Sequence, residues 1–206
     1  MTIRVRAASC GLLLAPLLLI AGAAASAPLP GDRPAPGAPA PSRPDPADAE
    51  RLALEGALLR APDMATADAV GARLEALRMS RLSPTTRLLL NRAQRELAAG
   101  TLRDSRDDLD DALELQPDAA VLWRERATVR ATEGDLDGAV ADLGGALSRD
   151  PGDILSWSAL SAIEERRGQP RQAYEAWERV LRLDPMIEGG ATRLQRLHRQ
   201  MVGAPS

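Results

Sequence analysis

The sequence predicts an all-α fold: antiparallel helix pairs stacked into an α-solenoid and closed by a C-terminal capping helix. Three observations predict this class. The composition favours helices, a proline recurs every 34 residues, and a glycine recurs with the same period. Only 2% of the residues are aromatic and none is Phe, whereas β-sandwiches need β-branched and aromatic side chains to fill their faces. Ala, Leu, Arg and Glu are abundant instead, and they fit helices well.

Residues 1–25 have the three zones of a secretory signal peptide. Arg4 and Arg6 give a positive start, the apolar run 11–25 follows, and small residues end that run. The run is short for a bilayer span. We therefore expect export to the periplasm, with cleavage after Ala25. The alternative is an uncleaved anchor in the inner membrane that leaves the rest of the chain facing the periplasm.

The only cysteine, Cys10, lies before this apolar run, so cleavage would remove it. The mature chain would then form no disulfide and no thiolate zinc site. Residues 26–46 are rich in Pro, Ala and Gly and show no hydrophobic period. They predict a disordered linker, because such a segment buries too little apolar surface to offset its ordering entropy.

Residues 47–82 carry leucines at helical spacing and predict a hairpin of two helices joined at Pro62 and Asp63. The hairpin lacks the pattern of the repeats that follow, as terminal units often do because one face meets water. We expect it to pack on the first repeat.

Residues 83–187 predict three repeats, in windows 86–119, 120–153 and 154–187. The windows are aligned on Pro117, Pro151 and Pro185, and six further columns agree. These columns are Leu89, Trp123 and Trp157 (fourth); Ala93, Ala127 and Ser161 (eighth); Gly100, Gly134 and Gly168 (fifteenth); Ser105, Ala139 and Ala173 (twentieth); Leu109, Leu143 and Trp177 (twenty-fourth); and Ala112, Ala146 and Val180 (twenty-seventh).

Each column has a physical reason. Glycine ends the first helix of a window because it adopts a left-handed turn without strain. Small eighth and twentieth residues let two helices approach, large fourth and twenty-fourth residues fill the space between them, and proline ends the second helix. Ser83 before Pro84 predicts a helix start, and Thr101 with Asp104 predicts a capping box.

The segments RDDLDDALELQP, GAVADLGGALSRDP and QAYEAWERVLRLDP resemble the second helix and closing proline of the tetratricopeptide repeat (TPR) family. The resemblance covers about half of the chain. It is weakest in the first window, where Leu89 replaces Trp, and at the seventh place, where Arg92 and Arg126 stand against Leu160. Membership in this family implies a right-handed superhelix with a concave groove.

Residues 188–203 predict the capping helix that such a stack needs at its open end. Leu194 and Leu197 would face inward, and Arg193 and Arg196 would face outward.

The sequence offers little for catalysis, and we expect no enzyme, no cofactor and no metal. His198 is the only histidine and is expected to face solvent. The acid run from Asp104 to Asp111 lacks the glycine turn and ligand spacing of a calcium loop, so a solvated charged face is expected. A net charge of −3 without a basic face argues against nucleic acid.

The resemblance implies that the groove binds a segment of a protein or peptide partner. The family's groove positions correspond here to Arg87, Leu90, Gln94, Leu97, Val121, Arg124, Thr128, Ala131, Leu155, Ser158, Ala162 and Glu165. The Lys/Asn/Arg set that clamps chaperone tails in some members is absent, whereas Arg87 and Arg124 are candidates to pair with an acidic group. We therefore expect a non-catalytic adaptor or scaffold of the bacterial cell envelope. The alternative is a structural protein that self-associates or is membrane-tethered by an uncleaved anchor.

Overall fold

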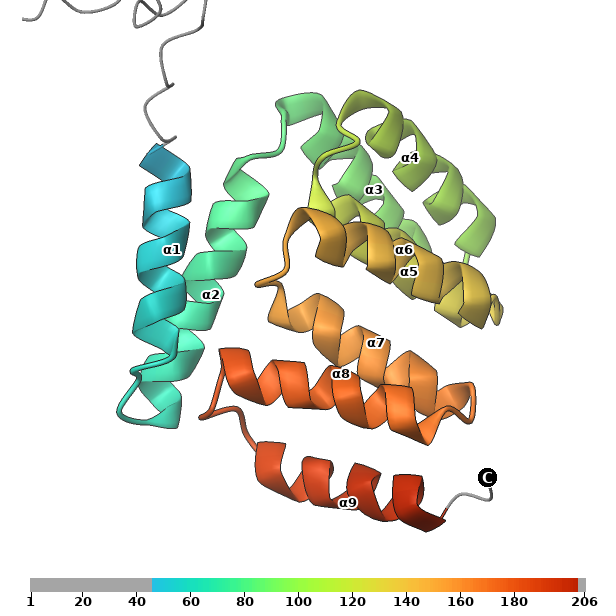
Figure 1. The fold of residues 1–206 in the computed structure, drawn as a ribbon. Helices are drawn as coiled ribbons and strands as arrows, with labels where there is room; N and C mark the ends of the chain where they lie inside the picture. Colours follow the sequence, from blue (N-terminus) through green and yellow to red (C-terminus); the bar gives the residue numbers. More distant parts are fainter. Residues whose placement is uncertain (1–45, 204–206) are drawn as a thin grey trace, which may run out of the picture. The chain divides into compact units, whose positions relative to one another are not determined.

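The computed structural model describes residues 46–203, which form nine helices and no strand. The predicted signal peptide and linker lie outside this part, except that α1 already begins at Pro46. The helices are α1 (Pro46–Leu58), α2 (Met64–Ser80), α3 (Pro84–Ala99), α4 (Leu102–Leu115), α5 (Ala120–Glu133), α6 (Leu136–Arg149), α7 (Ile154–Arg166), α8 (Pro170–Leu183) and α9 (Gly190–Gly203) (Figure 1). The prediction of an all-α fold is confirmed.

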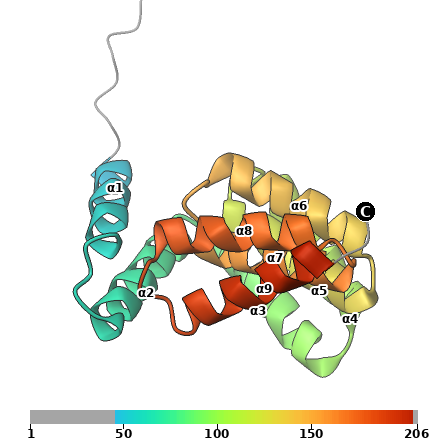
Figure 2. The same ribbon diagram turned by 60° about the horizontal axis from the view of Figure 1, so that its bottom comes forward.

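Helices α3 to α8 form three antiparallel pairs that stack in chain order (Figures 1 and 2). The pairs α3–α4, α5–α6 and α7–α8 correspond to the three predicted windows, and α9 packs on α8. Pro117, Pro151 and Pro185 lie two residues beyond the ends of α4, α6 and α8. The residue before each proline has extended backbone, as proline requires, so the second helix of every pair ends there. No helix of the described part is long and apolar enough to span a membrane.

The turns within the pairs depend on the glycines of the fifteenth column. Gly100, Gly134 and Gly168 have φ values of 81°, 92° and 70°. A side chain with a Cβ is strained in this left-handed region. The predicted role of this column as a helix end is therefore confirmed.

One of the two predicted helix caps is present. The Ser83 hydroxyl accepts a hydrogen bond from the Thr86 amide at 3.1 Å, and Pro84 occupies the first turn of α3. The predicted capping box at Thr101 is wrong, because this side chain accepts no amide of α4. Its hydroxyl donates instead to the Glu96 carbonyl at 3.1 Å, so it ties the start of α4 to the end of α3.

The small residues of the eighth and twentieth columns lie where the two helices of a pair are closest. In the first repeat, the Ser105 hydroxyl on α4 donates to the Ala93 carbonyl on α3 at 2.8 Å. In the third repeat the direction is reversed, and Ser161 on α7 donates to the Ala173 carbonyl on α8 at 2.9 Å. Both hydroxyls are buried and satisfied, so close packing of the helices leaves no unpaired polar group there.

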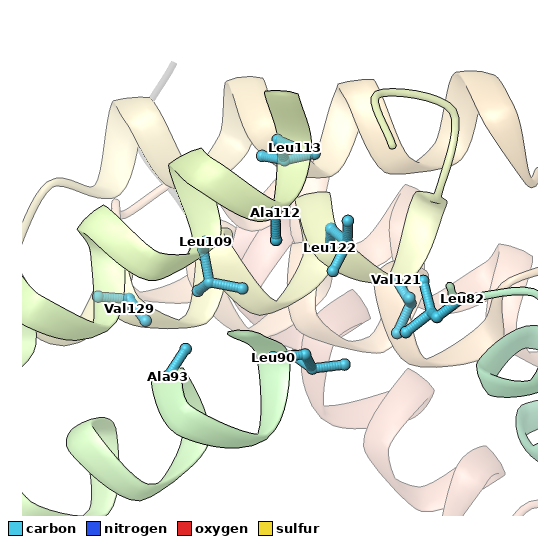
Figure 3. Packing of buried hydrophobic residues seen from close by; sticks show 9 residues of the cluster. All are labelled: Leu82, Leu90, Ala93, Leu109, Ala112, Leu113, Val121, Leu122 and Val129. Atoms are coloured by element: carbon cyan, nitrogen blue, oxygen red, sulfur yellow. The ribbon is translucent and has the colours of Figure 1, made fainter. Parts of the chain in front are cut away.

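The first two pairs share a continuous apolar core (Figure 3). Leu90 from α3, Leu109 from α4 and Leu122 from α5 are at most 1% exposed and pack together. Burying a leucine side chain fully contributes about 1.5–3 kcal/mol. The stack is therefore stabilised within and between repeats by the same side chains.

Two tryptophans anchor the first helix of one pair to the end of the preceding pair. The Trp123 indole nitrogen donates to the Pro117 carbonyl at 2.8 Å, and Trp157 donates to the Pro151 carbonyl at 2.9 Å. The Arg149 guanidinium lies over the Trp123 ring, 4.4 Å from its centroid. The fourth column thus joins successive repeats as well as filling space.

Two acidic residues lie inside the pairs, and one of them, Asp108, belongs to the acid run that was expected to be solvated. Asp108 and Asp142 are 1% and 2% exposed and pair with Arg92 and Arg126 across the first and second pairs. Arg126 holds Asp142 with two hydrogen bonds of 2.9 and 2.6 Å. The arginines of the seventh column, which looked like departures from the repeat, are therefore partners of buried carboxylates.

The hairpin α1–α2 lies along the loops that link successive pairs, and α2 crosses the ends of the stacked helices (Figure 1). Arg78 near the end of α2 donates to Asp150 at 2.7 Å and to the Gly152 carbonyl at 3.0 Å. Ile154 at the start of α7 packs against the hairpin's own apolar cluster around Leu74.

The expected packing of this hairpin on the first repeat is found only at its end. Met79 and Leu82 join the apolar core of the first two pairs. The rest of α2 contacts the second and third repeats instead, because its acidic and basic side chains find partners in the loops there.

The helix α9 covers the end of the stack, close to its predicted range. Leu197 is fully buried in one cluster with Trp177 and Val180 of α8. Arg193, which was expected to point outward, lies over the Trp177 ring at 4.2 Å, and the Trp177 indole nitrogen donates to the Gly190 carbonyl.

Candidate partner-binding groove

The predicted groove residues fall into three groups of accessibility. Leu90, Val121, Arg124 and Ala131 are buried. Leu97, Ser158 and Glu165 are half-buried. Arg87, Gln94, Thr128, Leu155 and Ala162 are exposed. Only the last two groups offer surface to a partner in this conformation.

The exposed surface centres on the ninth column. Gln94, Thr128 and Ala162 occupy equivalent places on α3, α5 and α7, and all three are exposed. Gln94 donates to Glu125 on the next repeat at 3.3 Å. These three exposed residues, two polar and one small and apolar, form a strip across the three first helices, which suits an extended or helical segment of a partner.

Arg87, one of the two cations considered for an acidic partner, already makes hydrogen bonds. Its guanidinium donates to the Met79 carbonyl at 3.0 Å and to the Leu82 carbonyl at 3.3 Å. These carbonyls lie where α2 ends and the chain turns into α3. Arg87 therefore fixes this junction.

Arg124, the second cation, is 6% exposed and lies between carboxylates. It donates to Asp153 at 2.7 Å and also to Glu75 of α2. Burial alone would lower the pKa of Arg124, but the charges of Asp153 and Glu75 outweigh burial and raise its pKa. The guanidinium is permanently charged and binds two carboxylates, those of Asp153 and Glu75. Glu75 belongs to the hairpin, so the hairpin occupies one of the two binding positions of Arg124.

Asp153 is a site residue that the sequence analysis missed. It is fully buried, caps α7 by accepting from the Leu155 amide at 3.1 Å, and also accepts from the Ser156 hydroxyl and from Arg124. An aspartate directly before a predicted helix is the sequence signal of such a cap. Its partners Glu75 and Arg124 lie far apart in the chain, and no local pattern indicates them.

The third repeat's groove residue Glu165 is held by the capping helix. It pairs with Arg193 at 3.1 Å and with Arg196. The groove therefore ends at α9.

A further hollow lies between α2 and the third repeat. Its volume is about 330 Å³, and its apolar wall comes from Ile154, Leu155 and Ile187. Asp68 and Asp184 stand at its rim. The side chain of Leu155, which was predicted to line the groove, borders this hollow instead.

Nothing in the described residues gathers groups for catalysis or metal binding. No set of three or more His, Cys, Asp or Glu side chains in residues 46–203 is placed to hold a metal ion. His198 is exposed and contacts the Tyr174 ring edge-on, with the ring centroids 5.7 Å apart.

Stacked helix pairs with a strip of short exposed side chains along their first helices define the protein as an α-solenoid of the repeat-protein class. The chain is 28% identical over 144 residues to a TPR repeat-containing protein of Rhizobium etli, a match that covers 70% of each chain. No family model matches the chain.

Solved structures of TPR domains have the same fold. The first TPR domain of Spaghetti (RPAP3), solved with an HSP90 peptide, is 18% identical and has a TM-score of 0.55; the match covers 59% of this chain and 96% of that one. The Sgt2 TPR domain of Aspergillus fumigatus is 19% identical with a TM-score of 0.54, and the match covers 60% of this chain and 87% of that one. The TPR2B domain of yeast Sti1, in complex with pHsp70, is 15% identical with a TM-score of 0.52, over 58% of this chain and 98% of that one. The chain therefore has the fold of TPR domains.

Proposed function

We propose that this protein is a non-catalytic adaptor that binds a segment of another protein along the first helices of its repeats. The observation that carries the proposal is the exposed strip of Gln94, Thr128 and Ala162, which repeats with the 34-residue period. Two of the similar solved structures are complexes with HSP90 and pHsp70 partners. These partners support a protein or peptide ligand and do not identify it.

The chemistry of the groove narrows the class of ligand. The two arginines considered for an acidic partner are engaged by the chain itself, and the carboxylates of Glu125 and Glu165 border the open strip. The open strip therefore suits a neutral or basic segment with small polar contacts. An acidic partner would have to pair with Arg124, and α2 covers this residue.

Binding along the strip is tested by capture from a bacterial envelope fraction. The variant Thr128→Arg/Ala162→Arg places two large charges on exposed positions of α5 and α7, so its fold is expected to persist. It should lose the captured partner. The matched control Ala141→Arg/Gln172→Arg places the same charges on exposed positions of α6 and α8 and should retain it. Equal capture by both variants would exclude the strip as the binding site.

We place this adaptor in the periplasm because residues 1–25 have the pattern of a cleaved signal peptide. Mass spectrometry of the protein recovered from cells should give an N-terminus at Ser26. An intact N-terminus would favour the membrane-tethered alternative, in which residues 1–25 anchor the chain.

Self-association is the second candidate function, and one observation favours it. Leu52 in α1 and Leu59, the residue directly after α1, are 60% and 52% exposed. Light scattering that gives a dimer for the natural chain and a monomer for Leu52→Arg/Leu59→Arg would establish this function.

A further inference from the structure

Helix α2 lies on the second and third repeats in the manner of a bound ligand helix. The residues that face the repeats form one stripe along α2: Ala67, Gly71, Leu74, Glu75 and Arg78. Their spacing of three and four residues places them on one side of the helix.

The polar end of this stripe is matched in charge to the surface beneath it. Glu75 meets the Arg124 guanidinium, and Arg78 meets the Asp150 carboxylate at 2.7 Å. Arg78 also donates to the Gly152 carbonyl at 3.0 Å. The surface thus presents a cation and an anion at the spacing of one helical turn.

The apolar part of the stripe fills its surface incompletely. Ile154 packs against the apolar cluster of the hairpin, but beside this contact a hollow of about 330 Å³ is lined by Gly71, Ala72 and Leu155. Leu155 stays 50% exposed, and a Cβ placed on Gly71 would meet no atom within 4 Å. Well-packed protein contacts leave few voids larger than a water molecule. The contact between α2 and the third repeat therefore has room for a larger side chain at Gly71.

We infer that this surface is the docking site of a partner helix, and that α2 is its built-in competitor. The partner is an amphipathic helix that carries a carboxylate for Arg124, an arginine one turn later for Asp150, and a large apolar residue where α2 has Gly71. Such a helix makes the two ion pairs of α2 and also fills the hollow. The hairpin must be displaced for it to bind, which lowers the apparent affinity until the partner's better packing outweighs α2.

The inference rests on the proposed adaptor function and adds to it a second class of partner, an amphipathic helix that carries one carboxylate and one arginine a turn apart. It also explains why both predicted cations of the groove are engaged in this conformation.

The test uses a fluorescent peptide of residues 64–80 that carries Gly71→Leu as the probe. Titrated against the full chain by anisotropy, it should bind the Glu75→Gln protein about tenfold more tightly than the natural protein, because the internal competitor has lost its charged hydrogen bond. The Gly71→Ala protein should bind several-fold more weakly, since alanine strengthens α2 as a helix. A peptide that also carries Glu75→Gln should bind all three proteins weakly.

A cross-linked form of the protein tests whether α2 must be displaced before the probe can bind. In a Cys10→Ser background, Ala72→Cys and Leu155→Cys, which border the same hollow, are joined by a cleavable bismaleimide linker. Cross-linked protein should bind no probe, and cleavage of the linker should restore binding. Equal affinity of the probe for all variants and for the locked form, or no binding by any of them, would overturn the inference. If locked protein still captures its envelope partner, the adaptor function stands and this docking site fails.

Discussion

The carboxylate of Asp142 lies inside the second repeat, and its arginine partners are not kept in the third repeat, where the buried Glu164 replaces Arg130. Arg126 and Arg130 both reach this carboxylate. The equivalent places in the third repeat hold Leu160 and Ala176. One position of the repeat thus accepts either an ion pair or an apolar pair of similar volume, as is known for buried ion pairs in general.

Removal of one partner should be more harmful than removal of both. Asp142→Ala removes the buried carboxylate that Arg126 and Arg130 share. It should lower the free energy of unfolding by about 2 kcal/mol, less than for a fully buried pair, because Arg126 keeps its ion pair with Asp110 and some solvent. The double variant Arg126→Leu/Asp142→Ala places the leucine and alanine of the third repeat at these two positions and should recover part of this loss, since Arg130 still lacks Asp142. Urea unfolding followed by circular dichroism measures both. A double variant no more stable than the single one would contradict this account.

Asp184 predicts a pH-dependent effect at the hollow. Burial raises the pKa of this carboxyl above its usual 3.8, and the nearby Asp68 raises it further. The native state therefore binds this proton more tightly than the unfolded chain, so the stability that Asp184 contributes falls as the pH rises through its pKa. Asp184→Asn keeps the acceptor for the Met186 amide and should melt at a higher temperature than the natural chain at pH 7. The difference should vanish below about pH 3.8, and a difference that persists there would disprove the role of charge.

At the scale of elements, replacing two glycines of the second repeat by alanine should change the free energy of unfolding in opposite directions. Gly134 has φ 92° at the turn between α5 and α6, so Gly134→Ala should lower the free energy of unfolding by about 1–2 kcal/mol. Gly144 lies inside α6, and a Cβ there meets no atom within 4 Å. Gly144→Ala should raise the free energy of unfolding by about 0.5–1 kcal/mol through helix propensity. Thermal melts of the two variants provide the comparison, and two changes of the same sign would refute it.

The sequence predicts the helices and turns of the stack better than it predicts where the hairpin α1–α2 packs. The turns and helix ends of α3 to α8 follow from single residues such as Gly100 and Pro117, whose effect is local. The position of α2 depends on pairs such as Glu75–Arg124 and Arg78–Asp150, which are 49 and 72 residues apart. The repeat period of the sequence does not indicate pairs between residues so far apart in the chain. For the same reason the burial of Arg124, which was expected to line the groove, could not be foreseen from the sequence.

At the scale of the whole molecule, the stack is one-dimensional, because each pair packs on its neighbours in chain order. A destabilising substitution at one end of the stack should therefore lower the stability of the helices at that end most. Leu197→Ala removes a fully buried side chain of α9 and should cost about 2–5 kcal/mol locally. Hydrogen exchange should show lost protection in α8 and α9 and nearly unchanged protection in α3 and α4. Uniform loss throughout the stack would indicate a single cooperative unit instead.

The positions of the tryptophans give the molecule a selective optical signal. All three, Trp123, Trp157 and Trp177, lie in α5, α7 and α8, so intrinsic emission reports the second and third pairs. Ellipticity at 222 nm counts every helix, including α1 and α2. A fall in ellipticity at constant emission therefore identifies melting of helices at the N-terminal side, in the hairpin or the first pair, and a fall in both signals identifies unfolding that includes the second and third pairs.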